Sequence, residues 1–199
     1  APERIHFVGN VMIDSLLQLL PRAAGSPILD TLHLAESRYV AVTLHRPSNV
    51  DDPRRLRLIL EQLQALALDL PVVFPIHPRT RKMLEASSFS TQGSGLRIID
   101  PLGYLDFLRL QSSAALVITD SGGVQEETTF LGIPCLTVRP NTERPITITE
   151  GTNRLVDPER DDLGRVARET LERPRRRPVL EGWDGHAAER VCKILERAL

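Results

Sequence analysis

Short apolar segments recur along the chain and alternate with longer segments whose apolar residues have helical spacing. The apolar segments are rich in Val, Ile and Leu, and their length and composition are typical of buried strands. They cover residues 5–8, 39–44, 72–76, 96–99, 115–119 and 134–138. The sequence therefore predicts a strand at each of these places.

The segments between them place leucine or isoleucine at every third or fourth position. The clearest is 53–69, which begins with Pro53, a residue favoured in the first turn of a helix. Further helices are expected over 79–86, 104–113 and 122–131, and an amphipathic helix follows the basic segment that begins at Arg173. Alternating strands and helices form a parallel sheet with helices on both faces. The pattern predicts an α/β fold with a single Rossmann-like domain.

Polar residues directly follow five consecutive strands of the predicted sheet. Ligands of such sheets bind beyond the carboxyl ends of the strands, so these residues are the first candidates for a site. They lie at 45–49, 77–79, 100–104, 120–123 and 139–144. Because loops are polar in any protein, a purely structural explanation stays open for each loop taken singly.

The segment 119–127, TDSGGVQEE, joins a predicted strand to a predicted helix. Ser121 suits the helix N-cap, and Gly122 and Gly123 let a bound group approach the first amides of the helix. Such a helix start stabilises phosphate groups. A carboxylate beside a phosphate needs a neutral partner, so we expect Glu127 to accept hydrogen bonds from ribose hydroxyls. A capped helix without a ligand is the alternative.

Other candidate residues follow neighbouring strands or begin neighbouring helices. Arg144 can reach the same anion with a charge-assisted contact. His45 and Arg46 offer donors for phosphate or sugar, and His77 has a similar position, although each histidine can equally serve to cap a loop. Phe107 has the spacing of a core residue, but aromatic rings also stack on bases.

Composition and charge exclude several classes of protein. With 25 basic and 26 acidic residues, the chain has no net field that favours nucleic acid or an acidic membrane. Cys135 and Cys192 form no metal-binding spacing and are expected to be reduced core thiols. No apolar stretch approaches the ~20 residues of a membrane span, and no signal-peptide pattern begins the sequence, so we expect a cytoplasmic protein.

Three common catalytic or cofactor motifs are absent from the sequence. It has no GxGxxG for a dinucleotide, no GxxxxGK[ST] for a nucleoside triphosphate and no GxSxG nucleophile elbow. Hydride transfer, P-loop hydrolysis and serine hydrolase chemistry are therefore disfavoured.

An ordered set of motifs resembles the non-hydrolysing UDP-N-acetylglucosamine 2-epimerases. The motifs lie at 7–14, 45–46, 120–127, 131–134, 139–145, 150–153 and 184–187, so the resemblance spans nearly the whole chain. It implies a GT-B-like fold of two Rossmann-like domains. Residues 1–199 would be its C-terminal, UDP-binding domain, with 172–199 as connector and closing helix, and the N-terminal catalytic domain would be absent.

The resemblance also implies roles for particular residues. It assigns the binding of UDP to Ser121, Gly122, Gly123 and Glu127, with Arg144 and His45 at the diphosphate and Phe107 near the uracil. Arg46 and His77 resemble positions that help to bind a second, regulatory UDP-N-acetylglucosamine. Ser48 stands where many relatives carry Glu, which weakens the case for that regulatory site.

The family reaction interconverts UDP-N-acetylglucosamine and UDP-N-acetylmannosamine by eliminating UDP and adding it back on the other face. The resemblance implies no metal or other cofactor, and a homodimer for the intact enzyme. The main catalytic carboxylates are expected in the N-terminal domain, so His45 is the one catalytic candidate here and the chain alone is predicted to be inactive. Two alternatives stay open: the donor-binding domain of a GT-B glycosyltransferase, and a stand-alone module that binds nucleotide sugars.

Overall fold

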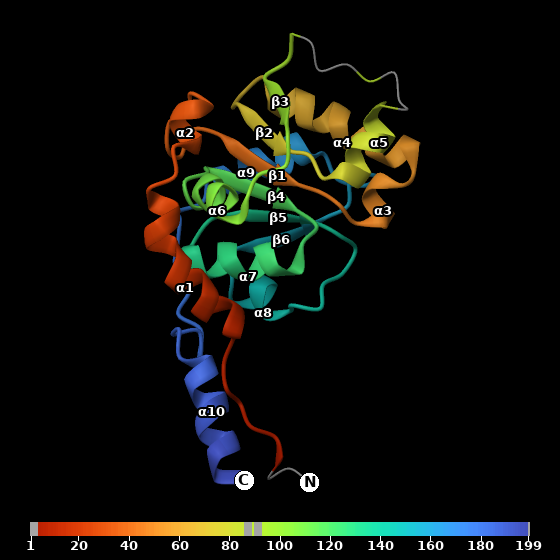
Figure 1. Cartoon of the computed structure of the whole chain (residues 1–199). Coiled ribbons are helices and arrows are strands. Elements are labelled where there is room, and N and C mark those ends of the chain that lie inside the picture. The colour runs from red at the N-terminus through yellow and green to blue at the C-terminus, as the bar shows by residue number, and fades with distance from the viewer. Residues whose placement is uncertain (1–3, 86–88, 90–92, 199) are drawn as a thin grey trace.

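The computed structural model describes residues 4–85, 89 and 93–198 and contains a six-stranded parallel sheet (Figure 1). The strands are β1 Val40–Thr43, β2 Val72–Pro75, β3 Leu96–Ile99, β4 Leu116–Thr119, β5 Cys135–Val138 and β6 Asn153–Val156. Their order in the sheet is β3-β2-β1-β4-β5-β6. The order changes direction between β1 and β4, and at such a point the carboxyl ends of the strands open a crevice for ligands. The predicted parallel, Rossmann-like sheet is confirmed.

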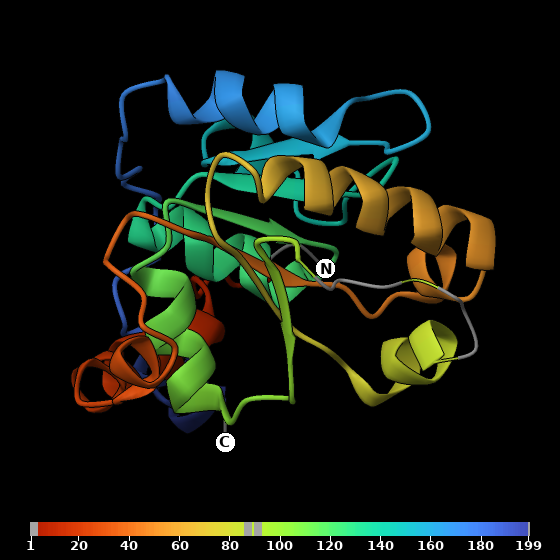
Figure 2. The ribbon, with the colours of Figure 1, turned by 90° about the horizontal axis from the view of Figure 1, so that it is seen from above.

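Helices cover both faces of the sheet (Figure 2). One face carries α3 Pro47–Val50, α4 Pro53–Leu66, α5 Pro78–Glu85 and α9 Leu163–Leu171, and the other carries α2 Ile28–Thr31, α6 Tyr104–Ser112 and α7 Gly122–Leu131. Helix α1, Val11–Ala24, packs outside α6 and α7 through Ile13 and Leu16. The short α8, Ile146–Thr149, precedes β6, and α10, Ala187–Ala198, ends the described chain.

The core follows from the hydrophobic pattern of the sequence. Leu56, Ile59 and Leu63 of α4 are fully or almost fully buried against strand residues such as Val42 and Phe74. Burial of one such leucine contributes roughly 1.5–3 kcal/mol to stability. Because strands of a parallel sheet are covered on both faces, they read as continuous apolar runs, and this is why the sequence reveals them.

The structure corrects some of the expected elements. Residues 5–8 were expected to form a strand but lie outside the sheet, and Ile5 and Phe7 are exposed. Strand β6 and helices α1 and α9 were not predicted. The helix expected over 79–86 is α5, and residue 86 lies outside the described residues. Cys135 is buried, as expected, whereas Cys192 is exposed and is not a core thiol.

An arm, defined here as residues 4–10 together with α10, projects from the body of the domain (Figure 1). At the base of the arm, Gly9 crosses Gly182 of the segment that leads to α10. Both glycines have positive φ, and a Cβ on Gly9 would lie 2.1 Å from the Gly182 oxygen. Asp14 of α1 accepts hydrogen bonds from the amides of Ala187 and Ala188 and so caps α10. The crossing therefore requires glycine, and it fixes where α10 leaves the domain.

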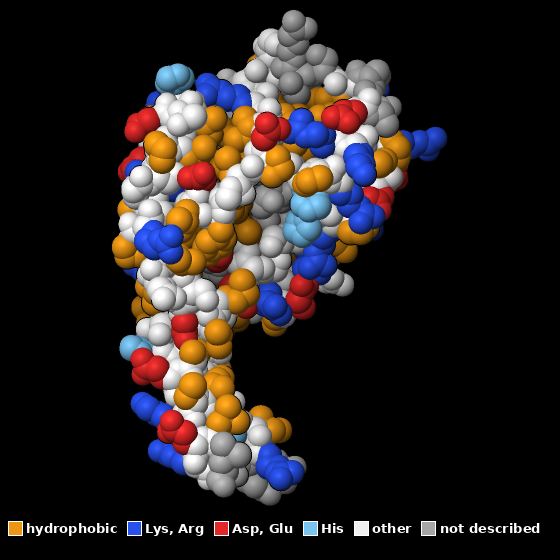
Figure 3. Space-filling model, viewed as in Figure 1, with side chains coloured by type: hydrophobic (Ala, Val, Ile, Leu, Met, Phe, Trp, Pro, Cys, Tyr) orange, Lys and Arg blue, Asp and Glu red, His pale blue; other side chains and the backbone are white. Residues whose placement is uncertain are grey.

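The arm exposes apolar side chains, which line one side of it in Figure 3. Ile5, Phe7 and Leu195 are all more than half exposed. None of the helices in the described part of the chain is long and apolar enough to cross a membrane.

Candidate functional site

Helix α7 begins at the carboxyl end of β4, at the point where the strand order changes direction. Ser121 is its N-cap, and the Ser121 hydroxyl accepts a hydrogen bond from the amide of Val124 at 3.5 Å. The Ser121 amide itself donates to the Thr119 hydroxyl at 3.0 Å, which ties the cap to the strand. The first amides of a helix have no partner within it and carry a partial positive charge. The start of α7 is therefore built to attract an anion.

The loop after β5 brings two charged side chains to this helix start. A Cβ built on Gly122 would lie 3.2 Å from Glu143 Oε1 and 4.0 Å from Arg144 Nε. The space beside Gly123 is taken by the end of the Met12 side chain, 2.8 Å from a Cβ built there. Side chains of the protein itself therefore fill the space beside both glycines.

Hydrogen bonds from α7 hold the loop that carries these residues. Gln125 is fully buried, and its Oε1 accepts a hydrogen bond from the Thr142 hydroxyl at 2.7 Å. Asn153 of β6 donates to the Gln125 carbonyl at 3.1 Å. Because Thr142 also accepts from the Arg144 amide at 3.0 Å, the position of the Arg144 backbone is fixed relative to α7.

Glu143, beside the start of α7, forms ion pairs with two arginines. Its carboxylate pairs with Arg46 at 2.9 Å and with Arg139 at 2.5 Å. The backbone amide of Glu143 itself, followed by these arginines, lowers the pKa of Glu143 to about 2. Glu143 is therefore an anion at neutral pH, and it lies where the sequence predicts a diphosphate.

Glu127 lies two turns into α7 and is held by two residues of α6. It is 5% exposed, and its Oε1 accepts a hydrogen bond from the Tyr104 hydroxyl at 2.7 Å while its Oε2 accepts from Gln111. Burial, together with the bond to Glu127, raises the pKa of Tyr104. Each carboxylate oxygen has a second lone pair, so Glu127 can still accept bonds from a sugar.

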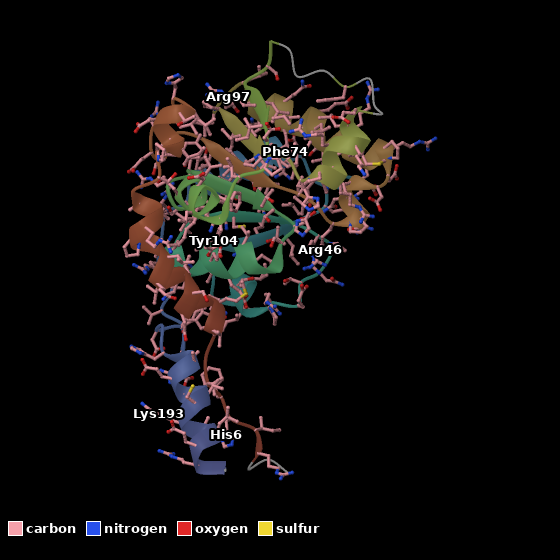
Figure 4. The ribbon with its side chains drawn as sticks, in the orientation of Figure 1. His6, Arg46, Phe74, Arg97, Tyr104 and Lys193 are labelled. Carbon is pink, nitrogen blue, oxygen red and sulfur yellow. The ribbon has the colours of Figure 1, made fainter. Side chains whose placement is uncertain are left out.

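Phe107 shares a face of α6 with both residues that bind Glu127, because it follows Tyr104 by three positions and precedes Gln111 by four. Phe107 is partly buried and packs against the buried residues on this face of the sheet, among them Tyr39 and Val124. Phe107 therefore lies on the face of α6 that carries Tyr104 and Gln111, the two residues that bind Glu127. In Figure 4, Tyr104 lies on the side of the domain that carries α6, and Arg46 lies on the side that carries α3.

Asp120 joins the ends of β1 and β4. Its carboxylate is fully buried and accepts hydrogen bonds from the His45 amide at 3.1 Å, the Arg46 amide at 2.9 Å and Asn49 Nδ2 at 3.0 Å. The ring nitrogen Nδ1 of His45 lies 3.1 Å from Asp120 Oδ1. Burial raises the pKa of Asp120, but the bonds from His45, Asn49 and Arg46 outweigh it and hold the pKa below its ordinary value.

Arg46 and His77 are both near His45. The Arg46 side chain donates from Nε to the Asp120 carbonyl at 2.9 Å and reaches Glu143 with Nη2. The His77 ring is 5.9 Å from the His45 ring, centroid to centroid, and its Nδ1 accepts from the Arg79 amide at 3.2 Å. The structure therefore gathers His45, Arg46 and His77 at the ends of β1 and β2.

Glu126 differs from Glu127 in its surroundings. Its Oε1 lies 3.0 Å from Arg144 Nε, and it is almost fully buried. Burial raises the pKa of Glu126, and Arg144 and Asn10 oppose this effect without cancelling it. Glu126 therefore acts as a partner of Arg144 in this structure. In the described part of the chain no group of three His, Cys, Asp or Glu side chains is arranged to hold a metal ion.

The sequence as a whole matches a protein-family model described as UDP-N-acetylglucosamine 2-epimerase over residues 1–196. The chain belongs to this family. The UDP-N-acetylglucosamine 2-epimerase of Methanocaldococcus jannaschii is 38% identical over 96% of this chain and 54% of its own length. The UDP-2,3-diacetamido-2,3-dideoxy-D-glucuronate 2-epimerase of Pseudomonas aeruginosa is 40% identical over 96% of this chain and 52% of its own.

A crystal structure of the M. jannaschii 2-epimerase, described as a complex with UDP-GlcNAc and UDP, aligns with a TM-score of 0.84 at 36% identity. The alignment covers 99% of this chain and 56% of that one. The chain thus spans about half the length of the 2-epimerases that it matches, and the GT-B-like, Rossmann-like fold expected from the resemblance is confirmed.

Within this 2-epimerase chain, the residues expected to bind UDP form two neighbouring groups. Ser121, Gly122, Gly123 and Arg144 meet at the start of α7, whereas Glu127 and Phe107 lie further along α7 and on α6. His45 joins the first group through Asp120, which directly precedes the Ser121 cap. Their binding roles stay predictions.

The sequence did not reveal the partners of these residues. Tyr104 and Gln111 hold Glu127, Asp120 and Asn49 hold the His45 loop, and Glu143 occupies the helix start. The spacing of positions 104, 107 and 111 could have indicated the α6 residues, because it places them on one face of a helix that follows a strand.

Proposed function

We propose that this chain is the UDP-binding part of a 2-epimerase that acts on UDP-N-acetylglucosamine. The observation that carries the proposal is the alignment of 99% of the chain with a 2-epimerase structure described as containing UDP-GlcNAc and UDP. The described site supports it, because a capped helix start with Arg144 beside it suits a diphosphate.

In this proposal the diphosphate lies at the amides of Gly122 and Gly123, near Arg144 and His45. The ribose hydroxyls donate to Glu127, and the uracil lies near Phe107. Departure of UDP from the sugar leaves negative charge on the diphosphate, and positive groups fixed at the helix start stabilise that charge. Arg46 and His77 are the candidates for contacts to a second, regulatory nucleotide sugar.

The M. jannaschii and P. aeruginosa relatives support UDP as the part of the substrate that this half of the protein recognises. They are almost equally similar to this chain, and their names share the UDP group and the 2-epimerase reaction but not the sugar. A site that recognises the nucleotide is consistent with both. We assign UDP-N-acetylglucosamine as the sugar nucleotide because the family model carries that name.

Calorimetric titration of the purified chain with UDP and with ADP, beside an assay for UDP-N-acetylmannosamine, tests the proposal. We expect saturable binding of UDP, much weaker binding of ADP and no conversion of UDP-N-acetylglucosamine by the chain alone. Equal binding of the two nucleotides would contradict the assignment of the uracil site. Appreciable epimerisation would show that the catalytic groups lie within this chain.

Replacing Glu143 with glutamine should tighten the binding of UDP about fivefold. Glu143 Oε1 lies 3.2 Å from a Cβ built on Gly122, so the carboxylate places a negative charge at the helix start, where the diphosphate is proposed to bind. Removing one like charge at about 4 Å in water is worth about 1 kcal/mol. Glu169→Gln is the matched control, since Glu169 also pairs with two arginines, Arg154 and Arg165, but outside the site. Weaker binding by Glu143→Gln would mean that Glu143 organises the arginines instead of competing with the ligand.

We further propose that the N-terminal half of the enzyme covers the apolar side of the arm, and that the complete enzyme is a homodimer. Ala188, Val191, Cys192 and Leu195 follow one another at helical spacing along α10, and Cys192 and Leu195 are exposed. An exposed apolar stripe of this kind is typical of a surface that packs against another domain.

Thiol modification should distinguish the two cysteines of the chain. Native protein treated with iodoacetamide should gain one adduct, at Cys192, because Cys135 is buried and burial raises the pKa of its thiol to about 12. Denatured protein should gain two. Peptide mass spectrometry locates the adducts, and two adducts in native protein would show that the β5 region opens in solution.

A further inference from the structure

Asp120 is a buried carboxylate that the proposed chemistry does not use. It lies at the switch point of the sheet, directly before the N-cap of α7, and it is completely inaccessible to solvent. Among the described residues, its carboxylate forms no ion pair with an arginine or a lysine, and the ionisable partner that it contacts is the His45 ring, at 3.1 Å. A buried carboxylate without a fixed cation is costly unless it is fully hydrogen bonded.

In the described part of the chain, the backbone and amide donors to the Asp120 carboxylate come from the segment that follows β1. Two backbone amides and Asn49 donate to it, and Asn49 is itself fixed because it also donates to the Val138 carbonyl at 2.9 Å. These donors hold the carboxylate in place, so Oδ1 presents a fixed acceptor to His45 Nδ1. The backbone of the His45 loop and its ring are thus oriented by the same side chain.

The two ring nitrogens of His45 then have different surroundings. Nδ1 is engaged by a buried acceptor, whereas the His45 side chain is 42% exposed overall, so the opposite edge of the ring, with Nε2, is available to a ligand. A hydrogen bond at one ring nitrogen decides which tautomer the neutral ring adopts. The bond to Asp120 also raises the pKa of His45, which favours the imidazolium.

We propose that Asp120 is a positioning residue that holds His45 with Nδ1–H toward the protein, so that the imidazolium donates Nε2–H to the diphosphate of UDP. This rests on the proposed function, since it names a contact within the same UDP site. His45 would then stabilise the departing diphosphate together with Arg144 and the α7 amides. The groups that face His45 are Asp120 from β4, the neighbouring Arg46 and His77 from the end of β2.

The ring nitrogens of the histidines, measured by ¹⁵N NMR over a pH range in the ligand-free chain, test the positioning directly. In the wild type we expect the neutral His45 ring to carry its proton on Nδ1. In Asp120→Asn the amide can donate to Nδ1, so the neutral ring should carry its proton on Nε2 and the titration midpoint should fall. The signals of His186, whose partner is Glu189 on α10, should be the same in both proteins and serve as an internal reference.

The affinity for UDP over the same pH range tests the contact with the ligand. In the wild type, affinity should fall about tenfold as the pH rises through the His45 midpoint, the size of one charge-assisted hydrogen bond. This step should move to lower pH in Asp120→Asn and vanish in His45→Gln. Binding of UDP without any such step would overturn the contact, although the proposed function would stand.

Failure of the proposal and failure of the proposed function give different results. If the neutral wild-type ring carries its proton on Nε2, the positioning role of Asp120 is overturned whether or not UDP binds. If Asp120→Asn does not fold, the tautomer of His45 in the wild type still tests the positioning role of Asp120. If the wild-type chain does not bind UDP, the proposed function fails, and the contact with the diphosphate fails with it.

Discussion

Replacing Asp120 with alanine should lower the free energy of unfolding by about 3–5 kcal/mol. The substitution removes the acceptor of the His45 and Arg46 amides and of one of the two hydrogen bonds that Asn49 donates, and these N–H groups lose their partner at the buried junction of β1 and β4. Removing one partner from a buried, hydrogen-bonded charge costs that much because the remaining groups stay out of water. Urea unfolding followed by circular dichroism measures the change.

Asp100→Ala is the matched control for this substitution. Asp100 also directly follows a strand, β3, but its side chain is 91% exposed and pairs with Arg81, which is itself partly exposed. Its replacement should cost less than about 0.5 kcal/mol, as is usual for surface positions. If the two variants lose the same stability, the hydrogen bonds of Asp120 do not hold the strand ends together.

The contribution of Asp120 should also depend on pH. Its pKa in the folded protein is lower than in the unfolded chain, so the unfolded state binds a proton more readily. The contribution is therefore complete above the pKa of an unfolded Asp, about 4, and is lost as the pH falls through the lower folded value. In Asp120→Ala this part of the acid destabilisation should be absent.

Replacing Glu127 with glutamine should weaken the binding of UDP about 10- to 100-fold. The substitution keeps the shape of the side chain but removes the charge that would accept hydrogen bonds from two ribose hydroxyls, and each charged hydrogen bond is worth about 1.5–3 kcal/mol. Tyr104 and Gln111 can still contact the new amide, so the helix packing should persist. Calorimetric titration with UDP measures the loss.

The comparison ligand for this experiment is 2′-deoxyuridine diphosphate. It lacks one of the two hydroxyls, so it should bind less tightly than UDP to the wild type, and the difference should nearly disappear in Glu127→Gln. Equal losses for both ligands would mean that Glu127 supports α6 and does not read the ribose.

The sheet and the α7 site could be predicted from the sequence because both depend on local patterns. Buried parallel strands are continuous apolar runs, and the SGG segment marks a capped helix start whatever surrounds it. The strand β6 could not be predicted in this way, because it begins with Asn153 and Arg154. Asn153 is nevertheless buried there, since its amide donates to Gln125 and Thr129 of α7.

The contacts that organise the site depend on which strands are neighbours, and the sequence does not give that order. Asp120 meets His45 only because β1 and β4 are adjacent in the sheet. Tyr104 meets Glu127 only because α6 packs beside α7. For residues 5–8 the local pattern itself was misleading. Their apolar pattern is that of a buried strand, whereas Ile5 and Phe7 are exposed on the arm.

Amide NMR spectra of the ¹⁵N-labelled chain, recorded during titration with UDP, test the central claim most directly. The account predicts saturable shifts of the amides of Ser121, Gly122, Gly123 and Arg144, followed by those of Glu127 and its α6 partners, with little change in α9 and α10. A spectrum that does not change on addition of UDP, or shifts confined to other parts of the chain, would contradict the claim that UDP binds at the start of α7.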